Sequence, residues 1–260
     1  TLSLHDALPI STIIFQTNQN EQHGGQAIPA FDFFMAKGVA KSFRKHLASF
    51  INFYVAMENG NQADEKSIRT LIKEYLPSIK STEAERETLR IALVALQIII
   101  DKEHLARIVE KAYQQTRKDT HQAMEGFIHN LNTMHSRGGN QVVFSSINYG
   151  TDTSAEGRMV IEELLKATIE GLGTRGEVPV FPIQIFKVKD GVSYSEKDFE
   201  KAMKAENIEE AMTDSYEAPN FDLLLKACQT TAKALFPNFM FLDTPFNKNE
   251  KWKADDPQRY

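Results

Sequence analysis

The chain has 260 residues and a mass of 29.4 kDa, with 30 Lys and Arg residues against 35 Asp and Glu residues. The net charge of −5 argues against direct nucleic-acid binding, although a local cationic pocket for a phosphate is compatible with it. The longest apolar run, residues 91–100, is too short and too interrupted to span a bilayer. One cysteine, Cys228, excludes an intrachain disulfide and an all-cysteine metal site. It fits a reducing compartment, and we expect a cytoplasmic location.

Both ends of the sequence are unusual. Residues 1–10 lack the cationic region and the long apolar core of a signal peptide, and they read like a translated frame of a common sequencing adapter. We therefore expect a non-native scar that lies outside the fold. The chain has no initiator Met and stops at Tyr260 after a polar run, which we interpret as a fragment of a longer protein.

The first half, residues 11–137, is predicted to form a layer of helices. Residues 11–19 look like the tail of a helix, and the polar residues 18–26 that follow are a loop. Within this loop, His23-Gly24-Gly25 is interpreted as a helix-capping turn, with a ligand-binding loop as the alternative.

Residues 30–57 are predicted to form a long helix, because large apolar side chains recur on one side of it. Residues 59–88 are polar and rich in turns, so we predict a surface insertion around one short helix at 65–75. Helices at 89–100 and 105–135 complete the layer. The long helix also carries a cationic edge, which is usually a solvated face and alternatively a phosphate site; its members are Lys37, Lys41, Arg44, Lys45 and His46.

The chain changes from helices to strands after Gly138-Gly139, and the apolar period drops to two over residues 142–149. Phe144, Ser146 and Asn148 share one face of this predicted strand. Two hydrogen-bonding side chains on an interior strand are costly unless they have partners. We interpret them as the lining of a polar ligand cavity, because they come just before a Gly-containing turn; solvent exposure at a sheet edge is the alternative.

The remaining sequence alternates strands and helices, so we predict an α/β fold. Asp152 or Ser154 can cap the next helix, and the segment after it reads as a second strand that pairs in parallel with the first through a right-handed crossover. The predicted elements are a helix at 154–170, a strand at 180–188, a helix at 221–236 and a strand at 238–242.

No metal site or phosphate loop is predicted. His121 and Glu125 are one helical turn apart, but no third ligand is near them in the sequence. The run Gly171-Leu-Gly-Thr-Arg-Gly176 follows a helix instead of a strand, so we read it as a helix terminus. Cys228 is predicted to be a buried structural thiol on the apolar face of its helix.

Several segments follow one another with compatible spacing from about Gln22 to Pro237. They are Gln22-His-Gly-Gly-Gln26, Thr116-Arg-Lys-Asp119, residues 130–150, Gly171-Leu-Gly173 with Phe181-Pro182, and Asn220-Phe-Asp222 through Phe236-Pro237. Together they resemble the anaerobic (class III) ribonucleoside-triphosphate reductases, and residues 59–88 match least well.

The resemblance implies a ten-stranded α/β barrel, of which residues 138–260 would be the first, truncated part. It implies that the parent enzyme converts ribonucleoside triphosphates into deoxyribonucleoside triphosphates with a glycyl radical and a cysteine thiyl. An S-adenosylmethionine-dependent, iron–sulfur activating partner makes that radical in the family. The resemblance also implies control by ATP and deoxynucleotide effectors, a homodimer, and a zinc site in the C-terminal region of the parent.

The family's site residues carry over only in part. Phe144, Ser146 and Asn148 fall on the strand that lines the barrel and would contact substrate. Lys45 falls where the family has an effector-contacting lysine, and we expect His23-Gly24-Gly25 near it. The radical glycine and active-site cysteines fall outside this chain, so we expect no catalytic residue, metal or reductase activity in the fragment alone. The alternatives are another glycyl-radical barrel enzyme and a non-enzymatic, helical nucleotide-sensing module.

Overall fold

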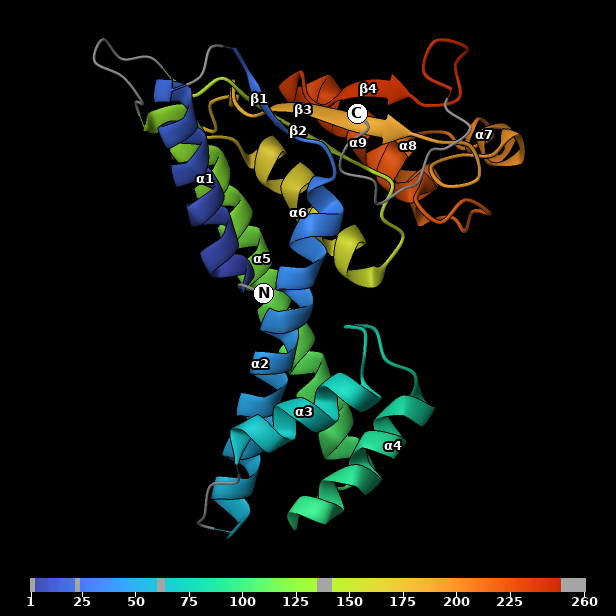
Figure 1. Ribbon diagram of the computed structural model, residues 1–260. Coiled ribbons are helices and arrows are strands. Elements are labelled where there is room, and N and C mark those ends of the chain that lie inside the picture. The colour runs from blue at the N-terminus through green and yellow to red at the C-terminus, as the bar shows by residue number, and fades with distance from the viewer. Residues whose placement is uncertain (1–2, 22–23, 60–63, 135–141, 249–260) are drawn as a thin grey trace.

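The computed structural model describes residues 3–21, 24–59, 64–134 and 142–248. Helices form one long layer, and a small sheet lies at one end of it (Figure 1). Among these residues, no helix is long and apolar enough to cross a membrane. The elements are α1 (Leu4–Glu21), β1 (Gln26–Ile28), α2 (Phe31–Asn59), α3 (Glu65–Tyr75), α4 (Glu83–Leu93), a short 3-10 helix (Val94–Leu96), α5 (Lys102–Thr133), β2 (Ser145–Tyr149), α6 (Ala155–Glu170), β3 (Ile183–Val188), α7 (Glu196–Ala202), α8 (Ile208–Thr213), α9 (Phe221–Ala234) and β4 (Asn238–Phe241).

The long helices α2 and α5 lie side by side and form the spine of the layer (Figure 1). Both predicted helices are confirmed to within three residues at each end. Val39, Phe43 and Leu47 of α2 recur at four-residue spacing and are at most 1% exposed, as expected for one apolar stripe facing the core. Phe31 of α2 stacks on Phe127 of α5, with ring centroids 5.5 Å apart.

Helix α1 begins inside the segment that the sequence analysis places outside the fold. Leu4 and Leu8 are 2% and 0% exposed and belong to the same core as α2 and α5. The structure thus includes residues 4–10 in the fold, because their two leucines are one helical turn apart and face α2. Gly38 of α2 permits this approach, since a Cβ there would lie 3.0 Å from the Leu4 backbone.

The short helix predicted at 65–75 is confirmed as α3, whereas the helix predicted at 89–100 begins earlier, as α4 at Glu83, and ends at Leu93. Helix α3 packs on α2, and α4 packs on both α3 and α5, at the end of the layer far from the sheet (Figure 1). Ile68 and Ile72 of α3 are fully buried. Thr82 and Glu85 form a reciprocal capping box at the start of α4, a start signal that outweighs the polar composition of this stretch.

The four strands form one parallel sheet in the order β1-β2-β3-β4, which is also their order along the chain. The predicted parallel pairing of the two central strands is confirmed. A right-handed crossover between each pair of neighbouring strands places every connecting helix on the same side. Helices α6 and α9, which follow β2 and β3, indeed lie against each other (Figure 1). The α/β class is confirmed, while the ten-stranded barrel stays a prediction.

The predicted burial of Cys228 is wrong, because its side chain is exposed. The core face of α9 is instead formed by residues such as Ala227 and Thr230, both fully buried. The apolar stripe of α9 is therefore shifted by about one position from the one expected around Cys228. The predicted break at Gly138-Gly139 lies outside the described residues.

One buried carboxylate joins the helical layer to the sheet. The Oδ2 atom of Asp32, at the start of α2, accepts hydrogen bonds from the backbone amides of Gly150, Thr151 and Asp152 at 2.8, 3.1 and 3.0 Å. Gly150 has φ +119°, and a Cβ there would lie 2.9 Å from the carbonyl oxygen of Lys187. The turn between β2 and α6 therefore depends on both the glycine and the carboxylate.

We predict that Asp32→Ala lowers the free energy of unfolding by about 3 kcal/mol or more, because three buried amides lose their acceptor. Urea denaturation followed by circular dichroism measures this change. Asp64→Ala is the matched control: it removes an N-cap of α3 that accepts two amides but is exposed, and its loss should be clearly smaller. Equal losses for the two variants would contradict the role given to Asp32.

Candidate functional site

The structure separates the two faces of β2 as the sequence predicts. Val143, Ile147 and Tyr149 alternate and are fully buried on one face. On the other face, Phe144 is 47% exposed, Ser146 is half-buried and Asn148 is 5% exposed. Phe144 precedes the hydrogen-bonded strand and packs edge-on against Phe181, with ring centroids 5.3 Å apart. The exposure of this face decreases toward the carboxyl end of the strand.

Polar groups on the buried face of the sheet are paired with each other. The hydroxyl of Tyr149 donates to Gln184 Oε1 at 2.8 Å, and Gln184 Nε2 donates to the Thr168 hydroxyl of α6 at 2.8 Å. Burial raises the pKa of Tyr149 well above its usual value, so its hydroxyl stays protonated and acts as the donor. These bonds also show that the Tyr149 face is the one covered by α6.

Asn148 points to the opposite face and differs from these residues in one respect. Its Oδ1 atom is buried but has no hydrogen-bond partner. An unpaired buried carbonyl oxygen costs roughly 1–3 kcal/mol, so such atoms are rare in native proteins. Asn148 lies at the carboxyl end of a parallel strand, just before the glycine turn, where folds of this class bind ligands. The arrangement leaves Oδ1 available to accept a hydrogen bond from a ligand.

Three members of the cationic edge predicted on α2, Lys41, Arg44 and Lys45, line a cleft of about 330 Å³. Half of the positive charges of the cleft were not expected from the sequence, because they come from α3 in the segment interpreted as an insertion. Burial lowers the pKa of Arg44, and Glu156 opposes this shift. The basic cleft is lined by Lys41, Arg44 and Lys45 of α2 and by Lys66, Arg69 and Lys73 of α3.

The glycine turn predicted to accompany Lys45 lies elsewhere. His23 is outside the described residues, while Gly24 and Gly25 are exposed just ahead of β1. Gly25 lines a hollow together with Met35 of α2. Lys45 is ten residues further along the same helix, about 15 Å away. Within one chain, Lys45 and the glycine turn are therefore not brought together.

A third group of polar residues lies between α5 and α6. His121 and Glu125, one turn apart on α5, meet Glu170 at the end of α6, and their ligand atoms lie within 4.8 Å of one another. Glu170 is 45 residues beyond Glu125, so the sequence around His121 and Glu125 shows no third ligand. Only the packing of α5 on α6 brings it near.

These features define an α/β protein with a singly wound parallel sheet. At the carboxyl end of one strand, the side-chain oxygen of Asn148 has no hydrogen-bond partner. The family described as anaerobic ribonucleoside-triphosphate reductase matches residues 3–260. The chain belongs to this family. The resemblance noted on the motifs of residues 22–237 is thereby confirmed.

Individual relatives match about half of the chain. An anaerobic ribonucleoside-triphosphate reductase of Enterobacteria phage T4 is 28% identical over 140 residues, which are 54% of this chain and 20% of the relative. Proteins of the same name from Escherichia coli and Haemophilus influenzae are each 26% identical, over 51% and 53% of this chain. The matched part is 16% of each of those two proteins, so this chain corresponds to a minor part of its relatives.

We predict that Asn148→Leu leaves the free energy of unfolding of this chain unchanged or raises it by up to about 1 kcal/mol, because the leucine removes an unpaired buried oxygen at similar volume. Tyr149→Phe is the control on the neighbouring residue. It should lower the free energy of unfolding by about 1–2 kcal/mol, since Gln184 Oε1 loses its donor. Urea denaturation measures both, and a large loss for Asn148→Leu would mean that the amide serves the fold.

Proposed function

We propose that the chain is part of an enzyme that reduces ribonucleoside triphosphates to deoxyribonucleoside triphosphates by glycyl and thiyl radical chemistry. Membership of the reductase family supports this proposal, and the names of the matched relatives agree with it. The observation in the structure that carries it is the buried, unpaired Oδ1 of Asn148 on the sheet face opposite α6. A substrate hydroxyl is a donor of the kind that this oxygen lacks.

The order of the strands supports the proposal that the parent protein closes a barrel. A doubly wound sheet reverses its strand order at a switch point, and the four described strands show no such reversal. Continued addition of parallel strands, each with its helix on the same side, curls a sheet into a barrel whose uncovered face becomes the interior. Ser146 and Asn148 would then face that interior, where exclusion of water protects radical intermediates.

The chain's own residues would bind and orient the substrate. Asn148 would accept a hydrogen bond from a ribose hydroxyl, Ser146 would offer a second polar group, and Phe144 would contribute an apolar wall. Cys228 is exposed on α9 and does not fit a radical role. The proposal therefore assigns the radical glycine, the active-site cysteines and the zinc site to parts of the parent protein outside this chain. An S-adenosylmethionine and iron–sulfur activating enzyme would generate the radical.

The basic cleft supports the further proposal of an effector site. Six cationic side chains converge on it, and Arg69 is paired there with Glu65. A nucleoside triphosphate carries several negative charges, which such a cluster can bind through charge-assisted hydrogen bonds. We propose that ATP or a deoxynucleotide binds here and that the parent enzyme is a homodimer located in the cytoplasm.

The rival functions differ in their use of the two sites. A glycyl-radical enzyme acting on a small acid or diol would use the barrel interior without a nucleotide effector. A non-enzymatic nucleotide sensor would use the cleft without Asn148. The coexistence of the cleft and the unpaired Asn148 oxygen in one chain favours the reductase over both.

We predict that Asn148→Leu in the full-length parent, activated under anaerobic conditions, lowers kcat/KM for ribonucleoside triphosphate by about 100-fold or more, because a buried polar contact to substrate is lost. Deoxynucleotide formation measures this, and the 260-residue chain alone should form none. Ser145→Ala is the control on the opposite face of the same strand, where Oγ bonds only the carbonyl of Val143. Full activity of Asn148→Leu would refute the proposed substrate contact.

We predict that the chain binds ATP or a deoxynucleoside triphosphate and that Lys45→Ala and Lys73→Ala each weaken the affinity about fivefold to tenfold. One substitution lies on each wall of the cleft. Isothermal titration calorimetry at fixed ionic strength provides the measurement. Lys233→Ala, an exposed lysine at the end of α9, is the charge-matched control. If all three variants bind equally, the nucleotide does not occupy this cleft.

A further inference from the structure

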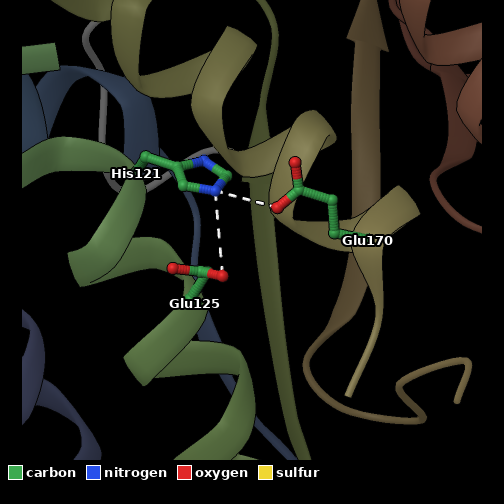
Figure 2. Close-up of side chains that lie close together, drawn as sticks. All are labelled: His121, Glu125 and Glu170. Carbon is green, nitrogen blue, oxygen red and sulfur yellow. Dashed lines mark hydrogen bonds and ion pairs between the residues drawn. The ribbon is translucent and has the colours of Figure 1, made fainter. Parts of the chain in front are cut away.

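The seam between α5 and α6 holds one imidazole among several carboxylates. The Nε2 atom of His121 lies 2.9 Å from Glu170 Oε2 and 3.8 Å from Glu125 Oε1. Figure 2 shows both carboxylates directed at this single nitrogen from two different helices. The imidazole is 16% exposed, whereas Glu125 and Glu170 are 51% and 44% exposed. An ion could therefore reach these three side chains from solvent.

The other ring nitrogen of His121 gives a second, independent observation. Its Nδ1 atom is buried, makes no well-aligned hydrogen bond, and lies 3.1 Å from Glu163 Oε2. Glu163 itself is 1% exposed. Metal-ligating histidines usually direct their second ring N–H at a carboxylate, which fixes the tautomer and leaves the other nitrogen free to coordinate. Glu163 occupies this position behind His121, and a small rotation of the ring would complete the bond.

The charged groups around His121 leave an excess of negative charge on the solvent side. Arg117 forms ion pairs with Glu162 and Glu163, and Lys226 also pairs with Glu162. The positive charge near Glu170 comes from Lys166, whose ammonium nitrogen lies 3.9 Å from it. Glu125 and Glu170 thus meet at one imidazole with little compensating charge. A divalent cation between them would balance two carboxylates at short range.

We propose that His121, Glu125 and Glu170 bind a divalent transition-metal ion, such as Zn²⁺, that links α5 to the end of α6. One imidazole nitrogen and two carboxylate oxygens suit such an ion, and water would complete a tetrahedral site. Ligand atoms around tetrahedral zinc are about 3.3 Å apart, so the exposed Glu125 side chain would move closer to Nε2. The ion replaces the hydrogen bond between His121 and Glu170. Its role is structural, and it is independent of the reductase function.

We predict that Zn²⁺ binds one site on the untagged chain and raises its melting temperature, while Mg²⁺ at the same concentration does neither, because imidazole is a poor Mg²⁺ ligand. Calorimetric titration and thermal unfolding measure the two effects. His121→Gln, Glu125→Gln and Glu170→Gln should each weaken Zn²⁺ binding at least about tenfold.

His46→Gln is the matched control, since His46 is half-buried between helices and pairs with one carboxylate, Asp119, at 2.8 Å. This variant should bind Zn²⁺ like the unmodified chain. Glu125→Gln alters an exposed side chain, so its result stands even if His121→Gln fails to fold. Co²⁺ added to the unmodified chain should give the visible absorption of a tetrahedral site. Absence of that absorption, or unchanged Zn²⁺ affinity in Glu125→Gln and Glu170→Gln, would overturn the proposal.

Discussion

The hydrogen bonds from the turn after β2 to Asp32 are the interaction on which the rest of the structure depends. The turn presents three consecutive amides that point in one direction, and a single carboxylate oxygen of α2 accepts all three. The carbonyl groups of the same turn are bound from the other side, because Asn220 Nδ2 donates to Gly150 and Asp152 at 3.0 Å each. Burial raises the pKa of Asp32, and the donated amides together with the charge of Lys187 oppose that rise. The turn thus ties α2, the sheet and the start of α9 together.

This turn also determines which side chains β2 directs to each face. Side chains alternate along a strand, so once the position of Gly150 is set, Tyr149 and Asn148 must point to opposite faces. The Tyr149 side chain lies on the side covered by α6 and donates a hydrogen bond to Gln184. The Asn148 side chain lies on the other side, and its oxygen has no partner. A shift of one residue would exchange the two side chains and leave the Tyr149 hydroxyl without Gln184. The structural hydrogen bonds on one face therefore hold the candidate ligand contact on the other.

Local sequence patterns were sufficient for the long helices and for the two faces of β2, because periods of 3.6 and 2 are repeated over many residues. Strand β1 was missed, since Gln26–Ile28 is too short to show a period and is recognisable only by its pairing with β2. The sequence also singled out Asn148, as a polar residue on an interior strand, and Lys45, through the family resemblance, and the ligand contacts expected of both stay predictions. It could not identify Asp32, Glu163 or Glu170 as partners, because each meets its contacts through tertiary packing alone. The error at Cys228 arose from a one-position shift in the helical phase.

The charged seam between α5 and α6 differs from the turn at Asp32 in what its polar groups contribute to the fold. Glu163 is almost fully buried and pairs with Arg117. Buried ion pairs in general contribute little net stability compared with an apolar contact, because desolvation offsets much of the attraction. This pair does contribute specificity, because a slip of α6 along α5 by one turn would leave a buried carboxylate unpaired. Helix α6 begins at the turn held by Asp32 and ends at Glu170 beside His121. The carboxylate at its start and the charged seam along its length therefore fix the position of a helix that contacts both the helical layer and the sheet.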